Sequence, residues 1–255
     1  MKNENMTLEL IDAHVHLDMI RPVEPAVDNA RSAGISGIVA VGMDLLSNLK
    51  TLTLARRFPG MVYPALGYHP WNIREDDIDK NLGFLDEQLK NAIALGEVGL
   101  DYKVKVKKEL QQRVFQSLLG LAEKYGKPVN VHSRYSYERT HAMVAATHIP
   151  KAVFHWYSGP MEVLDKILDD GYFISATPAL AYSDKHREAM IRAPLSNILI
   201  ETDAPVEFNG KASEPATLVE TLHELARLKK LPVSEVAHIT TKNSRKFYGL
   251  KEDPG

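Results

Sequence analysis

The stretch Ile200-Glu201-Thr202-Asp203-Ala204-Pro205 decides how this chain folds. It follows the apolar run 197–200, which predicts a buried strand. Because proline cannot donate a backbone hydrogen bond, Ala204-Pro205 cannot continue a central strand. Asp203 is therefore expected at the tip of a strand, where α/β folds carry their catalytic and binding groups.

Length and composition indicate a globular protein with a substantial core. The chain has 255 residues, enough for one α/β barrel or two smaller domains, and 44% of them are hydrophobic. A formal net charge of −2 provides no overall cationic field that would recruit nucleic acid. The sequence has no cysteine, which excludes disulfides, thiolate metal sites and a catalytic thiol.

The sequence also predicts the compartment. No run approaches the ~18 apolar residues that a membrane span requires. The polar start, residues 1–6, is followed by no apolar signal region. We therefore expect a soluble, cytoplasmic protein without membrane contact, and nothing in the sequence points to an obligate protein partner.

Strand and helix patterns alternate along nearly the whole chain. The expected strands span residues 8–15, 37–41, 62–66, 92–95, 128–131, 152–154, 172–175 and 197–200. The expected helices span residues 25–32, 45–57, 81–90, 108–125, 137–146, 163–168, 185–191, 215–228 and 233–247. Without a linker, repeat or low-complexity segment, residues 1–255 are expected to form one domain with its core at about 8–250.

Eight such units in ~250 residues match a TIM-type (β/α)8 barrel. The spacing of metal-ligand residue types favours the same fold, since His16 to Glu97 is 97 − 16 = 81 residues, about three units of ~27. The next separations are 35 residues to His132, 23 to His155 and 48 to Asp203. These residues therefore follow strands one, four, five, six and eight. A closed barrel brings all five strand ends to one mouth, whereas an open sheet would spread them along its edge.

The same residue types predict a metal centre. His14 and His16 stand two apart at a strand end, so both imidazoles lie on one face and can chelate one ion. Alone, each candidate has an ordinary alternative as a surface histidine, a strand-end carboxylate or a hydrogen-bonded core histidine. Their combination at barrel-compatible spacing favours metal ligation, and the complete set is His14, His16, Glu97, His132, His155 and Asp203.

Four imidazoles and two carboxylates suit two divalent ions such as Zn²⁺, Mn²⁺ or Mg²⁺. Glu97 follows Gly96, where close packing leaves room for a carboxylate that bridges two ions at the ~3.5–4 Å typical of such hydrolytic sites. Asp203 could ligate one ion and accept the proton of an activated water. Glu97 and Asp203 are therefore the predicted catalytic residues of a metal-dependent hydrolase.

At these residues the chain resembles the TatD-related metal-dependent deoxyribonucleases, which belong to the amidohydrolase-like barrels. The resemblance covers about residues 8–250 and rests on His14-Val15-His16-Leu17-Asp18, Gly67-Tyr68-His69-Pro70, Gly96-Glu97-Val98-Gly99-Leu100-Asp101, His132-Ser133-Arg134, His155-Trp156-Tyr157-Ser158-Gly159 and Glu201-Thr202-Asp203-Ala204-Pro205. It implies a TIM-type barrel, two divalent metal ions held by the six residues above, and hydrolysis of DNA phosphodiesters, typically from the 3′ end.

Two segments depart from the family pattern. The family usually has Cys-Phe or a similar pair after the strand-six histidine, where this chain has Trp156-Tyr157. After Asp-Ala-Pro the family commonly continues with Leu and an Arg-containing loop, whereas residues 206–215 contain no arginine. Both departures concern the surroundings of the predicted metal centre rather than its ligands.

Four further residues are candidates for substrate binding. Arg134, two residues beyond His132, could hold a phosphate or could be a surface arginine that opens the next helix. His69 could contact a phosphate or a leaving group, or be a structural histidine. Lys103 and Lys105 belong to a segment that leaves strand four, and they either overhang the barrel mouth or form an exposed, solvated run. Aromatic residues near strand ends could stack a base or pack in the core, namely Tyr68, Trp71, Trp156 and Tyr157.

The remaining histidines lie away from strand tips and are expected at the surface: His141, His148, His186, His223 and His238. Asp18 and Asp101 are expected to orient ligands or to act as plain caps. The leading hypothesis is a two-metal deoxyribonuclease that acts on single-stranded or frayed DNA ends. The alternatives are a metal-dependent amidohydrolase of small amides, esters or lactones, and a barrel scaffold without catalysis.

Overall fold

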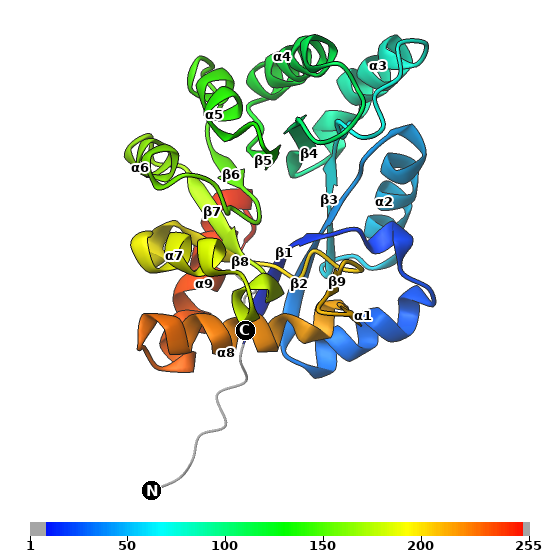
Figure 1. The fold of residues 1–255 in the computed structure, drawn as a ribbon. Helices are drawn as coiled ribbons and strands as arrows, with labels where there is room; N and C mark the ends of the chain where they lie inside the picture. Colours follow the sequence, from blue (N-terminus) through cyan, green and yellow to red (C-terminus); the bar gives the residue numbers. More distant parts are fainter. Residues whose placement is uncertain (1–8, 252–255) are drawn as a thin grey trace, which may run out of the picture.

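A computed structural model describes residues 9–251 of the chain. Leu8 of the expected first strand, together with the rest of residues 1–8 and residues 252–255, lies outside the described part. Eight parallel strands follow one another in sequence order around a nearly closed barrel, and helices surround it (Figure 1). The expected single-domain TIM-type barrel is therefore the observed architecture of the described residues.

The barrel strands pair in parallel with their neighbours in sequence. Their bounds are β1 (Leu10–Val15), β2 (Ile35–Val41), β3 (Val62–Leu66), β4 (Ala94–Asp101), β5 (Val129–Arg134), β6 (Ala152–Phe154), β7 (Phe173–Ala176) and β8 (Ile198–Ile200). The two ends of the sheet meet just beyond β8, where Val15 forms a bridge with Ala204. The backbone N–H of His16 also donates to the Ala204 carbonyl at 2.8 Å.

Helices cover the outside of the barrel (Figure 1). They are α1 (Val23–Ser32), α2 (Leu45–Arg57), α3 (Ile78–Gln88), α4 (Lys108–Tyr125), α5 (Tyr137–Ala145), α6 (Met161–Asp169), α7 (Asp184–Arg192), α8 (Leu218–Lys229) and α9 (Val233–Tyr248). Short 3₁₀ segments are η1 (Leu17–Met19), η2 (Leu89–Asn91), η3 (Pro178–Ala181), η4 (Leu195–Asn197) and η5 (Pro215–Thr217). Among the described residues, none of these helices combines the length and apolarity needed to cross a membrane.

The longest helix, α4, forms as its sequence pattern predicts. Leu110, Val114 and Leu118 recur at three-to-four-residue spacing and are all buried against the strands. Gly126 ends the helix in the left-handed conformation, with φ 60°, which glycine adopts without a steric cost. The helix therefore fixes the segment from Asp101 to Lys107, which leads into it from β4.

The end of α9 closes the barrel beneath the candidate site. Phe247 and Tyr248 pack with apolar side chains from seven of the eight strands. The Tyr248 hydroxyl donates to the Ala13 carbonyl at 2.8 Å and accepts from the Asn130 side-chain amide at 3.2 Å. Since this end is filled, the opposite end, at the carboxyl termini of the strands, is where side chains can form an open site.

Two strands extend further than expected. The expected strand 92–95 stops before Glu97, but β4 continues to Asp101, so Glu97 lies within a strand. The expected strand stopped before Gly96, yet Gly96 and Gly99 allow β4 and β5 to approach closely. A Cβ on Gly96 would lie 2.6 Å from the Cβ of Asn130. For the same reason β5 continues to Arg134 rather than ending at residue 131.

The expectation that the remaining histidines lie at the surface was wrong for two of them. His141 is buried, and its Nε2 lies 2.8 Å from Asp170. His186 is fully buried, because α7 packs it against the residues that follow β6 and β7. A short antiparallel hairpin, β9 (Glu207–Phe208) and β10 (Lys211–Ala212), was also not expected.

Candidate metal centre

The six predicted ligand side chains lie together at the carboxyl ends of the barrel strands. His14, Glu97 and His132 belong to β1, β4 and β5. The other three lie on residues that follow β1, β6 and β8: His16, His155 and Asp203. Five of the six line one cavity of about 1950 Å³, and His14 lies fully buried behind them. The barrel thus gathers residues that are up to 189 positions apart, from 14 to 203.

One half of the cluster brings four possible ligand atoms for a cation close together. Its atoms are the Nε2 atoms of His14 and His16, Oε2 of Glu97 and Oδ1 of Asp203. All contacts between a histidine and another of these atoms measure 3.4–3.5 Å. The triangle formed by the donor atoms of His14, His16 and Asp203 has its centre about 2.0 Å from each corner, close to the ligand distance of Zn²⁺. These residues therefore fit a divalent metal ion.

Glu97 connects this half to a second group through its other oxygen. Oε1 of Glu97 lies 2.8 Å from Nδ1 of His132 and 2.8 Å from Nε2 of His155. The two nitrogens are 3.3 Å apart. Because His132 and His155 also line the cavity, this three-donor group is open toward it. Catalytic metal sites combine three protein ligands with an open position in the same way.

Partners behind His14 and His132 hold one ring nitrogen of each, so that the other nitrogen faces the cluster. His14 Nδ1 donates to Asn130 Oδ1 at 3.1 Å, which leaves Nε2 as the acceptor. Nε2 of His132 lies 3.2 Å from Asp101 Oδ2, so Nδ1 faces the cluster. Such partners fix the tautomer and orientation of metal-binding histidines and raise their basicity. The arrangement therefore suits metal ligation better than a set of ordinary core hydrogen bonds.

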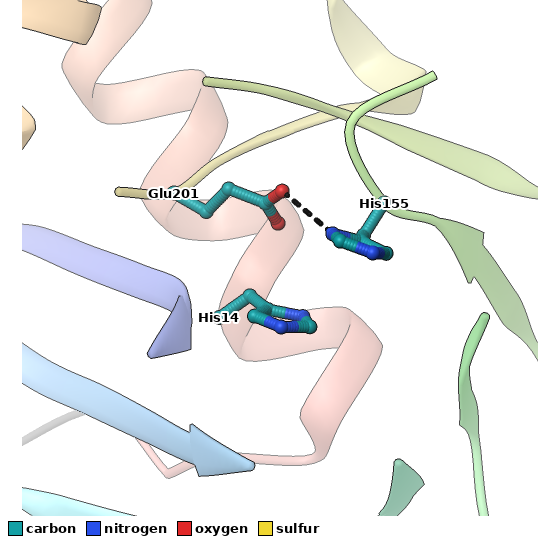
Figure 2. Close-up of side chains that lie close together, drawn as sticks. All are labelled: His14, His155 and Glu201. Carbon is teal, nitrogen blue, oxygen red and sulfur yellow. Dashed lines mark hydrogen bonds and ion pairs between the residues drawn. The ribbon is translucent and has the colours of Figure 1, made fainter. Parts of the chain in front are cut away.

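Glu201 is a site residue that the sequence interpretation missed. Figure 2 shows its carboxylate directed at His155, whose Nδ1 lies 3.3 Å from Oε1 of Glu201. The rings of His155 and His14 stack beside it, with centroids 4.3 Å apart. Oε2 of Glu201 is buried without a hydrogen-bond partner among residues 9–251. The sequence did contain a signal, since Glu201 stands two residues before Asp203 and so faces the same way in an extended chain.

The closure of the barrel places Asp203 beside the histidines of β1. The Asp12 carboxylate accepts hydrogen bonds from the Thr202 backbone N–H at 2.9 Å and hydroxyl at 2.6 Å. The Asp203 N–H donates to the His14 carbonyl at 3.1 Å. Asp203 itself has φ 52°, a left-handed conformation that aspartate tolerates better than most residues. The turn that ends β8 is thus bonded directly to the ligand-bearing strand.

A close backbone approach also fixes Glu97. A Cβ added to Gly67, which follows β3, would lie 2.4 Å from the backbone nitrogen of Glu97. Only glycine fits at that position. The Asn48 side chain holds Gly67 through two hydrogen bonds, of 2.7 and 3.0 Å. The position of the Glu97 backbone between β3 and β5 is therefore determined by residues on both sides.

The pKa shifts in the cluster favour ionised carboxylates beside histidines. Burial alone would raise the pKa of Glu97, but the surrounding His69, His155 and His14 lower it well below its usual value. Burial alone would also raise the pKa of Asp203, but its contact with His16 and the nearby His14 and His155 together lower it. Both carboxylates are therefore charged at neutral pH, as metal ligands must be.

His69 faces the cluster as a hydrogen-bond donor. Its Nδ1 accepts from the Trp71 backbone N–H at 3.2 Å, so the proton resides on Nε2, which points to Oε1 of Glu97 at 3.3 Å. Burial lowers its pKa to about 4, and the ring is neutral at physiological pH. A protonated Nε2 cannot ligate a cation, although His69, Glu97 and His132 lie close enough together to form a candidate cluster.

Arg134 and Trp71 are held at the cavity by Asp101. The buried Asp101 carboxylate accepts from Arg134 Nε at 2.9 Å and from Trp71 Nε1 at 2.5 Å. It also lies beside His132, as described above. The Arg134 guanidinium lies over the Trp71 ring, 5.3 Å from its centroid. Arg134 lines the cavity and retains donors that Asp101 does not use.

The remaining substrate-binding candidates differ in position. Lys103 lines the cavity, whereas Lys105 is exposed on the same segment and outside the cavity lining. Of the aromatic candidates, Tyr68 and Tyr157 are buried in the core and unavailable for stacking. The two tryptophans do line the cavity: Trp71 and Trp156.

The sequence matches the family model of the TatD related DNases over residues 11–249. Among curated proteins, the chain is 29% identical to an uncharacterized metal-dependent hydrolase of Methanocaldococcus jannaschii over 94% of this chain and 97% of the relative. It is also 29% identical to the human deoxyribonuclease TATDN3, over 94% of both chains. The chain therefore spans nearly the full length of these relatives.

A solved structure shares both fold and sequence similarity with this chain. The crystal structure of YJJV, a TatD homologue from Escherichia coli, superposes with a TM-score of 0.87 and 26% sequence identity. The match covers 96% of this chain and 100% of that protein. The barrel described above is thus the architecture of this relative as well.

Proposed function

The chain belongs to the TatD-related DNase family and is a metal-dependent hydrolase, and from this premise we propose that it hydrolyses phosphodiester bonds at the ends of DNA strands. The observation that carries the proposal is Glu97, whose two oxygens join a four-donor group to an open three-donor group. Such a bridged arrangement is typical of two-metal phosphoester hydrolases. We expect removal of one nucleotide at a time from the 3′ end of single-stranded or frayed DNA.

In this proposal the residues of the cluster hold two divalent cations, for which Zn²⁺, Mg²⁺ and Mn²⁺ are candidates. When bound, they would lower the pKa of a water molecule and offset negative charge on the phosphate. His14, His16 and Asp203 belong to one position, His132 and His155 to the other, and Glu97 to both. Of the two proposed catalytic residues, Glu97 would bridge the two cations and Asp203 would accept the proton of the water.

Asp203 suits the role of proton acceptor. Its Oδ1 is buried without a hydrogen-bond partner in the described part of the chain, and the carboxylate lines the cavity. The lowered pKa keeps it deprotonated before a proton arrives. His69, which presents an N–H in the same region, would donate to a phosphate oxygen or leaving group, and Arg134 would hold a neighbouring phosphate.

The size of the cavity favours a polymer end over a small ester. Its volume of about 1950 Å³ exceeds the ~300–1,000 Å³ of typical small-molecule pockets. Cationic side chains lie on its wall, Arg134 and Lys103 among them. A single strand could enter such a mouth and place its terminal phosphodiester at the cluster. A cytoplasmic location without an obligate protein partner is part of this proposal, and cell fractionation with size measurement would test it.

The proposal is tested with a 3′-labelled and a 5′-labelled oligonucleotide, single-stranded and duplex, beside a panel of lactones, amides and carboxylic esters. We expect stepwise shortening of the single strand and little turnover of the panel. Asp203→Asn should lower kcat on the oligonucleotide by about 10²-fold or more, as loss of general acid–base help does, with little change in Tm. A variant that keeps more than a tenth of the activity, or a wild type that prefers the panel, would contradict the proposal.

A further inference from the structure

Three aromatic side chains from three separate loops meet at one side of the cavity. Trp156 directly follows His155, Tyr182 follows η3, and Phe208 lies in the β9–β10 hairpin. The Trp156 and Phe208 ring centroids are 5.0 Å apart, and those of Tyr182 and Phe208 are 6.4 Å apart. Trp156 and Tyr182 line the cavity, and Phe208 is buried behind them. We call these three residues the aromatic wall.

The hairpin that carries Phe208 is built to hold this position. Its turn is Asn209-Gly210, with φ 52° and 75°, the pair of positive values that a tight two-residue hairpin turn requires. The base of the hairpin is closed where the Ser213 N–H and hydroxyl both donate to the Val206 carbonyl, at 3.1 and 2.8 Å. Val206 in turn donates to the Asp203 carbonyl at 3.0 Å. The hairpin is therefore joined directly to a residue of the metal centre.

The backbone of Trp156 is held in an uncommon conformation. Its φ is 43°, which bulky residues rarely adopt. The Ser175 hydroxyl accepts from the Trp156 N–H at 2.9 Å, and His186 Nδ1 donates to the carbonyl of the next residue, Tyr157, at 2.8 Å. Such conformations persist where the surroundings impose them, and they cluster at functional sites. Here the result is a half-buried indole on the cavity wall, one residue from His155.

We propose that the aromatic wall stacks the nucleobase of the nucleotide whose phosphodiester lies at the metal centre. This inference rests on the proposed function and deepens it, because it assigns the part of the substrate that Trp156 and Tyr182 contact. A base offers a flat apolar face to an indole or phenol ring, and such stacking does not depend on which base is present. The wall binds the base, while Lys103 and Arg134, which line the same cavity, face the phosphates.

Two segments distant in sequence form most of the wall. Trp156 and Phe208 are 52 positions apart in sequence, 208 − 156, yet their rings are in contact. The bulky residue after His155 thus packs against the hairpin that follows Asp203.

Fluorescence tests the stacking without turnover. The sequence has only two tryptophans, so Trp71→Phe leaves Trp156 as the sole indole. In metal-loaded protein of this background we expect dAMP to quench the emission saturably, and 2-deoxyribose 5-phosphate, which has the same phosphate but no base, to leave it unchanged. Tyr182→Ala should weaken dAMP binding about five-fold or more. Tyr135→Ala, an exposed aromatic on another part of the cavity wall, is the matched control and should not.

A kinetic test compares two oligonucleotides that differ only in the terminal nucleotide, which carries adenine or an abasic tetrahydrofuran. Wild type should show kcat/KM about ten-fold higher for the strand with the base. Trp156→Ala should remove this preference, and Trp156→Phe, which keeps a ring, should retain most of it. The ratio between substrates is the readout, because a variant that merely perturbs His155 would lose activity on both strands equally.

The outcomes separate the two proposals. If neither strand is hydrolysed by wild type while dAMP still quenches Trp156, the proposed function fails and the stacking site stands. If wild type hydrolyses both strands equally and dAMP acts like the base-free phosphate, the stacking site fails and the proposed function stands. Equal losses on both substrates in Trp156→Ala and Tyr182→Ala would also overturn the inference.

Discussion

At the scale of single residues, Glu97 is the contact between the two halves of the candidate metal centre. Its Oε2 faces His14 and His16, and its Oε1 faces His132 and His155. Truncation to alanine removes a ligand from each half at once. Elemental analysis of Glu97→Ala should therefore show the metal content falling from about two ions per chain toward one or none.

Glu138→Ala is the matched control for this measurement. Glu138 also lines the cavity, but its carboxylate is 81% exposed and pairs only loosely with Lys166, at 3.8 Å. We expect its metal content to equal that of wild type. If Glu97→Ala retained the wild-type stoichiometry, the bridging ligand would have to be another residue.

We expect Glu201 to affect the candidate metal centre through another side chain. It lies at Nδ1 of His155. Burial alone would lower the pKa of His155, but the nearby Glu97 and Glu201 carboxylates raise it well above its usual value. Glu201→Gln removes the charge and keeps the shape. Competition with a chelator should show a loss of metal affinity of about 10- to 100-fold at one of the two positions, the usual cost of removing such a partner. Unchanged affinity at both positions would reduce Glu201 to a structural role.

At the scale of elements, His186 connects α7 to the residues that follow β6 and β7. It donates from Nδ1 to the Tyr157 carbonyl and accepts at Nε2 from the Thr177 N–H, at 2.8 and 3.1 Å. Burial lowers its pKa from 6.5 to about 4, so the unfolded chain binds a proton at a higher pH than the folded protein does. The contribution of His186 to stability is therefore complete above pH ~6.5 and is lost as the pH falls toward ~4.

His186→Asn tests this sign. Asparagine can still donate to the Tyr157 carbonyl but does not titrate, and it leaves the Thr177 N–H without its acceptor. We expect the variant to be less stable than wild type by about 1–3 kcal/mol at pH 7.5. Urea unfolding at a series of pH values should show this difference shrinking as the pH falls from 7 to 5. A difference that stayed constant or grew would mean that His186 does not titrate as proposed.

The element pattern shows what could and could not be predicted from sequence. Alternating apolar runs and helical spacing predicted the eight strands and the surrounding helices, because both signals are local. The predicted ends of the fourth and fifth strands were wrong. Whether a strand ends at Gly96 depends on how closely the neighbouring strand approaches it, which the local sequence does not report. The hairpin at Asn209-Gly210 had its turn signal but lacked strands long enough to be recognised.

For the candidate site as well, local sequence patterns predicted some residues and missed others. The six predicted ligands, from His14 to Asp203 in chain order, were expected to lie together because a closed barrel brings the carboxyl ends of its strands to one mouth. Glu201 is only two residues from Asp203 in the sequence. Its contact with His155 distinguishes it from an ordinary core carboxylate, and this contact is visible only in the structure. The burial of His186 depends on the packing of α7 against distant strand ends, which no local pattern reports.

At the scale of the whole molecule, the apolar packing that closes the barrel and the charged candidate site lie at opposite ends of the barrel. The end closed by Phe247 and Tyr248 is apolar, and the other end holds the charged cluster at the base of a large cavity. The net charge of −2 provides no general attraction for DNA, so attraction must come from cations near the mouth. Lys103 is one of them, and it makes no ion pair with any residue in the described range 9–251.

Two lysines of one segment allow this local attraction to be measured. Lys103 and Lys105 are both exposed, but only Lys103 lines the cavity, where the Asp101 carboxylate fixes its backbone through a 2.8 Å hydrogen bond. Lys103→Glu should weaken oligonucleotide binding and reduce the slope of log K against log salt by about one, since each lost phosphate contact has that effect. Lys105→Glu carries the same charge change on the same segment and should have a smaller effect. Hydrolysis of a small phosphodiester, which reaches no lysine, should be nearly unchanged in both variants.

Two outcomes would contradict this prediction. Equal effects of the two substitutions would show that only the overall charge of the segment matters. Equal losses on the small substrate would show that the lysines do not follow the DNA strand.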